Sequence, residues 1–202
     1  MNLRTELPTA ENSSNFNAVA NAATKAGTTL ENLKAAVAGE TGASAKYAAF
    51  AKAAKEQGFD QLARLWEATS AAEQIHINLG ASLVEAEDPS YTRPTAEAPA
   101  PEAIDLNLIA SANGEIFETS DMYPTFIKKA QEEGHAKAVK VFTRAKLAEA
   151  VHAEKYLEAY NNIDAADDDA YYLCPGCGYI HKGDDFEKCP ICGVPKAKFQ
   201  RF

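Results

Sequence analysis

The sequence predicts a mainly α-helical protein. A four-helix bundle, with a long crossover between its second and third helices, is followed by a small four-cysteine domain. Three observations lead to this prediction. Apolar side chains recur at helical spacing in four long segments of the 202-residue chain. Four prolines separate the second of these segments from the third. All four cysteines lie close together near the end of the sequence.

The four helical segments have recognisable ends. The first is rich in alanine, begins at Thr28–Glu31, whose residue types resemble a helix start, and ends at Gly58. We expect Phe50, Trp66 and Phe126 on the apolar faces to lie in the core. The other three segments are predicted at residues 60–85, 103–133 and 136–162.

The segments between and around the helices divide the chain into three parts. Residues 88–101 hold the four prolines and are predicted to be the crossover. Residues 1–27 have weak periodicity and are predicted to be an N-terminal extension with at most a short helix. Residues 28–165 form the predicted bundle, which leads into an acidic linker at residues 164–169. Residues 166–202 form the cysteine domain, which is too short for a core of its own and needs a metal.

Composition and charge exclude some classes of partner. The formal net charge is −9 and the sequence pI is about 5.0, whereas nucleic-acid binding requires a basic face. The sequence has no run of 18 apolar residues, so we expect no membrane span. The polar N-terminal stretch lacks the basic start and apolar run of a secretory signal, so we expect a cytoplasmic protein.

An internal repeat relates the first helix pair to the second. Four residues recur at a constant offset of 76 positions, namely Tyr47, Gly58, Glu73 and His76 as Tyr123, Gly134, Glu149 and His152. Glu40 and Glu115, by contrast, are offset by 75 positions. The second repeat therefore has one extra residue, and a helix usually absorbs an extra residue as a π-bulge. We predict such a bulge between residues 115 and 123.

The four helices carry carboxylates and imidazoles at matching depth. Residues three apart lie on one helix face, so both members of a pair can point at one centre. One glutamate from each of two helices, with Glu-x-x-His from each of the other two, is the ligand set of ferritin-like di-iron and di-manganese bundles. The alternative is solvated charges on alanine-rich helices, but the repetition favours metal binding. The candidate ligands are Glu40, Glu73, His76, Glu115, Glu118, Glu149 and His152.

The cysteines form two Cys-x-x-Cys motifs separated by eleven residues, Cys174/Cys177 and Cys189/Cys192. In a cytoplasmic protein such clustered pairs are more often metal ligands than disulfides. The spacing predicts a tetrahedral site of four thiolates, which accepts either iron or zinc. A glycine follows each motif, as in rubredoxin-like sites, which favours iron over a zinc ribbon.

Taken together, the bundle ligands and the cysteine domain resemble rubrerythrin from about residue 28 to the end of the chain. Three segments carry this resemblance besides the ligands, namely residues 38–40, 121–124 and 177–179. The resemblance implies a ferritin-like bundle that holds two iron ions and a rubredoxin-like domain that holds one.

The resemblance also implies roles for individual ligands. Glu73 and Glu149 would bridge the two irons, and Glu115 and His152 would bind one of them. Glu40 would bind the other iron together with Glu118 in the oxidised state or His76 in the reduced state, which makes Glu118 and His76 the candidate catalytic residues.

Other polar aromatic residues are assigned from their positions. Tyr47 and Tyr123 occupy matching places in the repeat and are candidates to donate hydrogen bonds to ligand carboxylates, the alternative being ordinary core tyrosines. His135 and His181 are interpreted as surface residues.

The expected function is hydrogen peroxide reduction to water in oxidative-stress defence. A donor such as rubredoxin or an NAD(P)H-dependent reductase would reduce the four-cysteine iron, which would pass electrons to the iron pair. The resemblance further suggests a homodimer in which the cysteine domain of one chain lies near the iron pair of the other. The leading alternative is a ferroxidase that handles iron. A di-iron oxygenase and a non-catalytic metal-binding or redox-sensing module are further alternatives.

Overall fold

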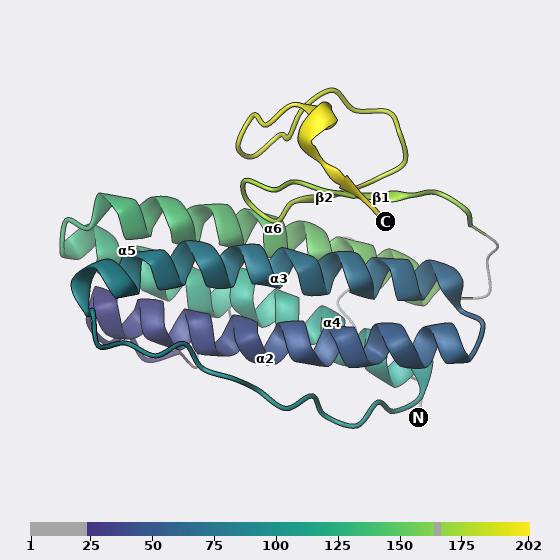
Figure 1. Cartoon of the computed structure of the whole chain (residues 1–202), viewed down its shortest axis with the longest axis horizontal. Coiled ribbons are helices and arrows are strands. Elements are labelled where there is room, and N and C mark those ends of the chain that lie inside the picture. The colour runs from purple at the N-terminus through teal and green to yellow at the C-terminus, as the bar shows by residue number, and fades with distance from the viewer. Residues whose placement is uncertain (1–23, 164–166) are drawn as a thin grey trace.

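The computed structural model describes residues 24–163 and 167–202. The short helix that the sequence allows in the N-terminal extension lies outside the described residues, as do residues 164–166 of the predicted acidic linker. In the part that is described, the predicted fold class is confirmed. A helical bundle carries a small cysteine domain on one side (Figure 1).

Two helical hairpins make up the bundle. The first pairs α2 (Thr29–Glu56) with α3 (Asp60–Glu87). The predicted third helix is built from three consecutive pieces, and α6 (Ala136–Asn161) packs beside them. Successive arms run antiparallel, and the proline-containing crossover runs the length of the bundle on the α2 side (Figure 1). The three pieces are α4 (Ile104–Phe117), the π-helix η2 (Glu118–Met122) and α5 (Tyr123–Glu132).

Local signals set the ends of the helices. The hydroxyl of Thr28 accepts from the backbone N–H of Glu31 at 3.2 Å, while the Glu31 carboxylate accepts from the backbone N–H of Thr28 at 2.7 Å. This capping box satisfies N–H groups that have no partner inside α2. Gly58 and Gly134 follow α2 and α5 with φ of +80° and +69°, a backbone region that suits glycine and stops each helix at the matching place in the repeat.

The predicted π-bulge is confirmed at η2. The backbone N–H of Tyr123 donates to the carbonyl of Glu118, five residues earlier, so the extra residue is accommodated inside the helix. Because the bulge lies between Glu115 and Tyr123, both side chains stay buried in the bundle despite the mismatch in the repeat.

Apolar packing surrounds the middle of the bundle from both ends. One buried cluster includes Phe50, Leu65 and Trp66, and the indole N–H of Trp66 donates to Ser111 at 3.0 Å. The other includes Phe126 and Phe142. The expected core positions of Phe50, Trp66 and Phe126 are therefore confirmed. The polar residues in the middle of the bundle therefore lie between two closely packed apolar clusters, which shield them from water on both sides.

The cysteine domain is a small antiparallel sheet with strand order β2-β1-β3. Its strands are β1 (Tyr171–Leu173), β2 (Ile180–Lys182) and β3 (Gln200–Arg201), and a 3₁₀ turn, η3, covers Lys196–Lys198. Tyr171, Leu173 and Ile180 are buried and join the apolar cluster of the bundle. The domain is thus anchored to α3 and α6 by burial of apolar surface (Figure 1).

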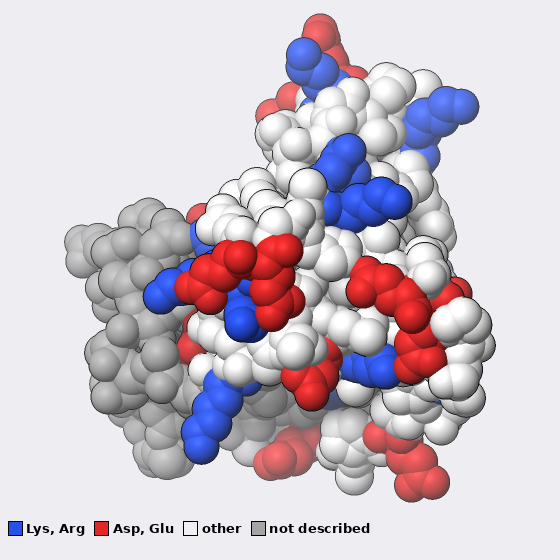
Figure 2. All heavy atoms as spheres, turned by 90° about the vertical axis from the view of Figure 1, so that its left-hand side faces the viewer, with Lys and Arg blue, Asp and Glu red and all other residues white. Residues whose placement is uncertain are grey.

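The surface reflects the acidic composition. Figure 2 shows acidic side chains gathered on the end of the bundle where α2 begins and α3 ends, and basic side chains on the cysteine domain above it. Among the described residues, no helix combines the length and apolar character needed to cross a bilayer.

Candidate metal centre

Seven ionisable side chains meet in the middle of the bundle, where they form what we call the carboxylate–histidine cluster. None of them is more than 8% exposed. α3, the α4–η2 segment and α6 each contribute two residues three positions apart, which therefore face the same way, and α2 contributes one glutamate. The members are Glu40, Glu73, His76, Glu115, Glu118, Glu149 and His152.

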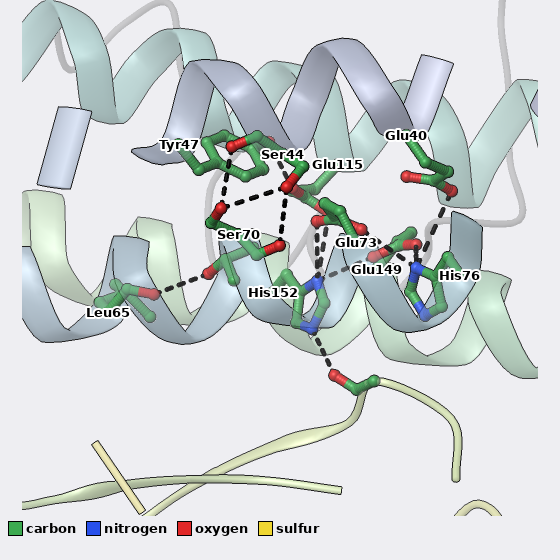
Figure 3. Close-up of polar contacts among 12 residues, drawn as sticks. Glu40, Ser44, Tyr47, Leu65, Ser70, Glu73, His76, Glu115, Glu149 and His152 are labelled. Atoms are coloured by element: carbon green, nitrogen blue, oxygen red, sulfur yellow. Dashed lines mark hydrogen bonds and ion pairs between the residues drawn. The ribbon is translucent and has the colours of Figure 1, made fainter. Parts of the chain in front are cut away.

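The structure divides the cluster into two overlapping groups. In each group every residue offers one ligand atom, and these atoms lie within 4.8 Å of one another. Glu73 and Glu149 belong to both groups and so lie between them (Figure 3). Glu40 and His76 complete one group, whereas the other is completed by Glu115 and His152.

The hydrogen bonds of the two imidazoles identify which nitrogen faces the cluster. Nε2 of His76 lies 3.0 Å from the carbonyl oxygen of Cys177, and Nε2 of His152 lies 2.8 Å from that of Gly178. A carbonyl only accepts, so Nε2 carries the proton in both rings and Nδ1 of the neutral imidazole has a free lone pair. Nδ1 of His76 is 2.7 Å from Glu149 Oε1, and Nδ1 of His152 is 2.8 Å from Glu149 Oε2. Both lone pairs therefore point at the carboxylates, as metal ligands do.

Several buried atoms of the cluster have no hydrogen-bond partner among the described residues. They include one oxygen each of Glu40, Glu73 and Glu115, both oxygens of Glu149, and Nδ1 of His152. Nδ1 of His152 lies close enough to a Glu149 oxygen for ion pairing but lacks hydrogen-bond geometry, whereas Nδ1 of His76 is within hydrogen-bond distance, 3.0 Å, of the other oxygen of Glu73. Buried carboxylates without partners are costly, and cations between them would remove that cost. The donor set thus fits a carboxylate-bridged pair of iron ions.

The pKa shifts of the cluster also indicate that its buried carboxylates lack enough positive charge around them. Burial, and then the neighbouring carboxylate of Glu73, raises the pKa of Glu115 to about 8. Burial and the charge of Glu118 raise the pKa of Glu40 well above its usual range. Burial opposes protonation of His76, but the Glu149 carboxylate outweighs it and raises the pKa of His76. Without metal, the cluster would hold protons in place of cations.

Two tyrosines hold carboxylates of the cluster in place. The Tyr47 hydroxyl donates to Glu115 Oε1, and the Tyr123 hydroxyl donates to Glu40 Oε1. Each bond joins one repeat to the other, so the pair follows the internal pseudosymmetry. These are the contacts that the sequence predicted for Tyr47 and Tyr123.

Glu118 differs from the other six residues. Its carboxylate lies outside both ligand groups, although its charge acts on Glu40. Burial and the charge of Glu115 raise the pKa of Glu118 well above the ordinary value. The structure thus has His76 facing the carboxylates and Glu118 set apart from them.

The four cysteines form a second site in the cysteine domain. The Sγ atoms of Cys174 and Cys192 are 3.4 Å apart, and those of Cys177 and Cys189 are 3.5 Å apart, with no disulfide. Four thiolates about 2.3 Å from one ion would be about 3.8 Å apart, so the arrangement fits a tetrahedral metal site. The hydrogen bond from the Cys177 thiol lowers the pKa of Cys174 to about 5, which favours the thiolate.

The two remaining histidines lie outside the ligand groups formed by the described residues. His135 accepts from the backbone N–H of Ala138 at the start of α6. His181 lies 2.9 Å from the exposed Asp185 on the cysteine domain. Both side chains are half-buried.

The cysteine domain lies directly over the carboxylate–histidine cluster of its own chain. The carbonyls of Cys177 and Gly178 contact the two imidazoles, a contact that sequence reasoning missed because every residue carries a carbonyl. The sequence marks Gly178 only as the glycine after a cysteine motif. The expected position of the domain near the iron pair of a second chain stays a prediction, as does the homodimer.

Comparison with known proteins places both parts of the chain in one group. Residues 31–160 match the family model described as Rubrerythrin, and residues 172–200 match the model described as Rubrerythrin, rubredoxin-like domain. The chain is 66% identical to nigerythrin of Nitratidesulfovibrio vulgaris over the whole of both chains. It is 34% identical to rubrerythrin of the same organism, over 87% of this chain and 95% of that protein. A solved structure titled "Fully reduced state of nigerythrin (all ferrous)" superposes with a TM-score of 0.91 over all of both chains.

Proposed function

This chain belongs to the rubrerythrin family, a family of iron-binding oxidoreductases, and on that premise we propose that it reduces hydrogen peroxide to water at an iron pair held by the carboxylate–histidine cluster. Electrons would arrive through the four-cysteine iron site. One observation carries the proposal. The consecutive carbonyls of Cys177 and Gly178 accept hydrogen bonds from an imidazole of each ligand group, so the two sites are joined without intervening solvent.

When bound, the iron pair supplies the two electrons that convert hydrogen peroxide and two protons into two molecules of water. The residues of this chain set the conditions for that reaction. Glu73 and Glu149 lie between the two ligand groups and are proposed to bridge them. Glu40 and Glu115 lie on opposite sides, each held by a tyrosine hydroxyl. Burial keeps the site dry and strengthens every electrostatic interaction inside it.

The route for electrons runs through the backbone of the cysteine domain. Cys177 contributes both a thiol to the four-cysteine site and a carbonyl to His76. His76 in turn presents Nδ1 to the carboxylates. A thiolate ligand and an imidazole ligand are therefore connected by covalent bonds and a single hydrogen bond.

Glu118 and His76 are proposed to alternate as ligands. His76 lies inside its ligand group in this structure while Glu118 lies outside, yet Glu118 is buried and its charge interacts with those of Glu40 and Glu115. It begins the π-helix, where helical hydrogen bonding is already irregular. Movement of Glu118 into the group would supply an additional carboxylate for a more highly charged, oxidised pair.

The remaining parts of the proposal concern partners and location. A rubredoxin or an NAD(P)H-dependent reductase is the proposed donor to the cysteine domain, where Cys192 is the most exposed of the four cysteines. A homodimer and a cytoplasmic location are proposed with it.

A single-turnover experiment tests the reaction. The iron-loaded protein is reduced without oxygen and mixed with one equivalent of hydrogen peroxide, while the absorbance of both centres is followed. We expect oxidation much faster than with dioxygen. Faster reaction with dioxygen, or a mineral core on iron addition, would favour the ferroxidase instead.

A metal-substituted control tests the relay. Protein with zinc in the four-cysteine site and iron in the bundle should complete one turnover, because its iron pair is intact. It should not turn over repeatedly with an external donor, because zinc is not redox-active. Repeated turnover at the full rate would contradict the relay.

A further inference from the structure

A lysine of α2 lies beside a tyrosine of the metal centre, without an ion-pair partner among the described residues. Nζ of the half-buried Lys46 lies 4.6 Å from the ring centroid of Tyr47, the tyrosine that donates to Glu115. A Cβ built at Gly114 would lie 3.3 Å from Lys46 Nζ and 3.6 Å from Tyr47 Oη. The ammonium therefore occupies the space over Gly114 that a larger residue would fill.

The charge of this ammonium acts on Glu118. Gly114 and Glu118 are four residues apart at the junction of α4 and η2, so they lie about one turn apart on one face of the helix. Glu118 lies outside both ligand groups. A buried carboxylate in this position needs a positive charge nearby to remain ionised.

We propose that Lys46 is a positioning residue whose ammonium, seated over Gly114, holds the Glu118 carboxylate away from the metal ligands. The proposal rests on the role proposed above for Glu118. The electrostatics agree with the geometry. Burial and Glu115 raise the pKa of Glu118, and the charge of Lys46 acts in the opposite direction.

The direction of the effect follows from the charge. With Lys46 present, ionised Glu118 is stabilised in its separate position and His76 remains the ligand of the reduced pair. Without Lys46, Glu118 is favoured inside the cluster, where its negative charge stabilises the more highly charged oxidised pair. Removal of the lysine should therefore lower the midpoint potential of the iron pair. For a one-electron couple, a tenfold change in the equilibrium constant corresponds to about 59 mV.

Three variants test the charge and its place. Lys46→Met removes the ammonium, Lys46→Arg keeps a positive charge, and Lys52→Met removes a lysine of α2 whose side chain is 80% exposed. The midpoint potential of the iron pair is measured by spectroelectrochemistry. For Lys46→Met we expect the midpoint potential to fall by about 59 mV, which corresponds to a tenfold change in the equilibrium between the oxidised and reduced iron pair. The other two variants should change the potential little. A potential equal to that of the unmodified protein in Lys46→Met, or an equal shift in Lys52→Met, would overturn the proposal.

A double-mutant cycle separates action through Glu118 from the direct field of the lysine. In a Glu118→Ala background, Lys46→Met should leave the potential unchanged, because the group that Lys46 positions is gone. A shift of the same size in that background would show that Lys46 acts on the iron directly and would overturn its role as a positioning residue.

X-ray absorption of the reduced protein gives a second readout. Histidine ligation should fall in Lys46→Met and remain in Lys46→Arg. Unchanged ligation in Lys46→Met would reject the positioning role. If instead the unmodified protein has the same ligands in both oxidation states, the Glu118–His76 exchange itself is wrong, whatever the rate of peroxide reduction.

Discussion

The Nε2 atom of His76 lies 3.0 Å from the carbonyl oxygen of Cys177. The two residues come from different domains, and each is also placed to bind metal in its own site. The contact depends on Gly178, because a Cβ at that position would lie 2.4 Å from His76 Nε2. The absence of a side chain at Gly178 thus allows the cysteine domain to approach the metal centre.

Gly178→Ala should separate the two sites without removing either. The added methyl meets a buried imidazole, so the domain has to move away from α3 and α6. We expect both sites to bind iron as before and electron transfer from the cysteine domain to the iron pair to slow at least tenfold. Stopped-flow absorbance after partial reduction of the four-cysteine iron measures this rate.

Gly193→Ala is the matched control for that change. Gly193 follows the second cysteine motif and has the same φ of +78° as Gly178, so alanine there carries a similar backbone cost, on the order of 1 kcal/mol. A Cβ at Gly193 meets nothing within 4 Å. Equal transfer rates in the two variants would contradict the importance of the His76–Cys177 contact.

Tyr47→Phe and Tyr123→Phe should weaken iron binding in the bundle. Each change removes the hydroxyl that holds Glu115 or Glu40, and the loss of such a supporting bond typically reduces metal affinity by about 10–100-fold. Chelator competition on the ferrous protein measures this affinity. Tyr156→Phe is the control, because Tyr156 packs 5.5 Å from the Tyr47 ring yet donates to no carboxylate among the described residues. An equal loss of affinity in Tyr156→Phe would show that the effect is one of packing.

Iron removal should make stability depend on pH. The folded-state pKa of Glu115 is about 8, and those of Glu40, His76 and His152 are also raised, so the folded metal-free protein binds more protons than the unfolded chain above the ordinary glutamate value of 4.5. Its free energy of unfolding should therefore fall as the pH rises from about 4.5 to beyond 8. Glu149 has a lowered pKa and contributes only to a loss at acid pH.

Urea unfolding of metal-free and iron-loaded protein across this pH range measures the effect. The iron-loaded protein should lack the decline, because its ligands are already deprotonated. Glu115→Gln should flatten the metal-free curve, because it removes one of the raised groups. A metal-free protein whose stability rises with pH through this range would contradict the assignment.

Helical periodicity explains why the bundle and its ligands were predictable. A helix places residues three apart on one face, so the spacing of Glu73 and His76 is enough to assign both to one centre. The π-helix was predictable for a similar reason, since comparing offsets of 75 and 76 counts the extra residue directly.

The contacts made by backbone groups and by flexible side chains were not predictable. The carbonyl of Cys177 has no signature in the sequence, because carbonyls are common to all residues. The position of Lys46 depends on the space over Gly114, which exists only after α2 and α4 have packed together. Where the cysteine domain lies depends on apolar burial of Tyr171 and Ile180 against the bundle, which the cysteine spacing does not encode.

Glu118→Ala tests whether the additional carboxylate takes part in the reaction. The reduced protein should keep two irons in the bundle, because both ligand groups are complete without Glu118. Peroxide turnover should fall at least tenfold, because the oxidised pair would lack the carboxylate proposed to join it. Metal analysis and steady-state peroxide consumption measure the two effects. Glu154→Ala, at an exposed glutamate of α6, controls for the change in net charge. Unchanged turnover in Glu118→Ala would show that Glu118 takes no part in the reaction and is only a buried charge of the bundle. The proposed alternation of Glu118 and His76 as ligands would then be wrong.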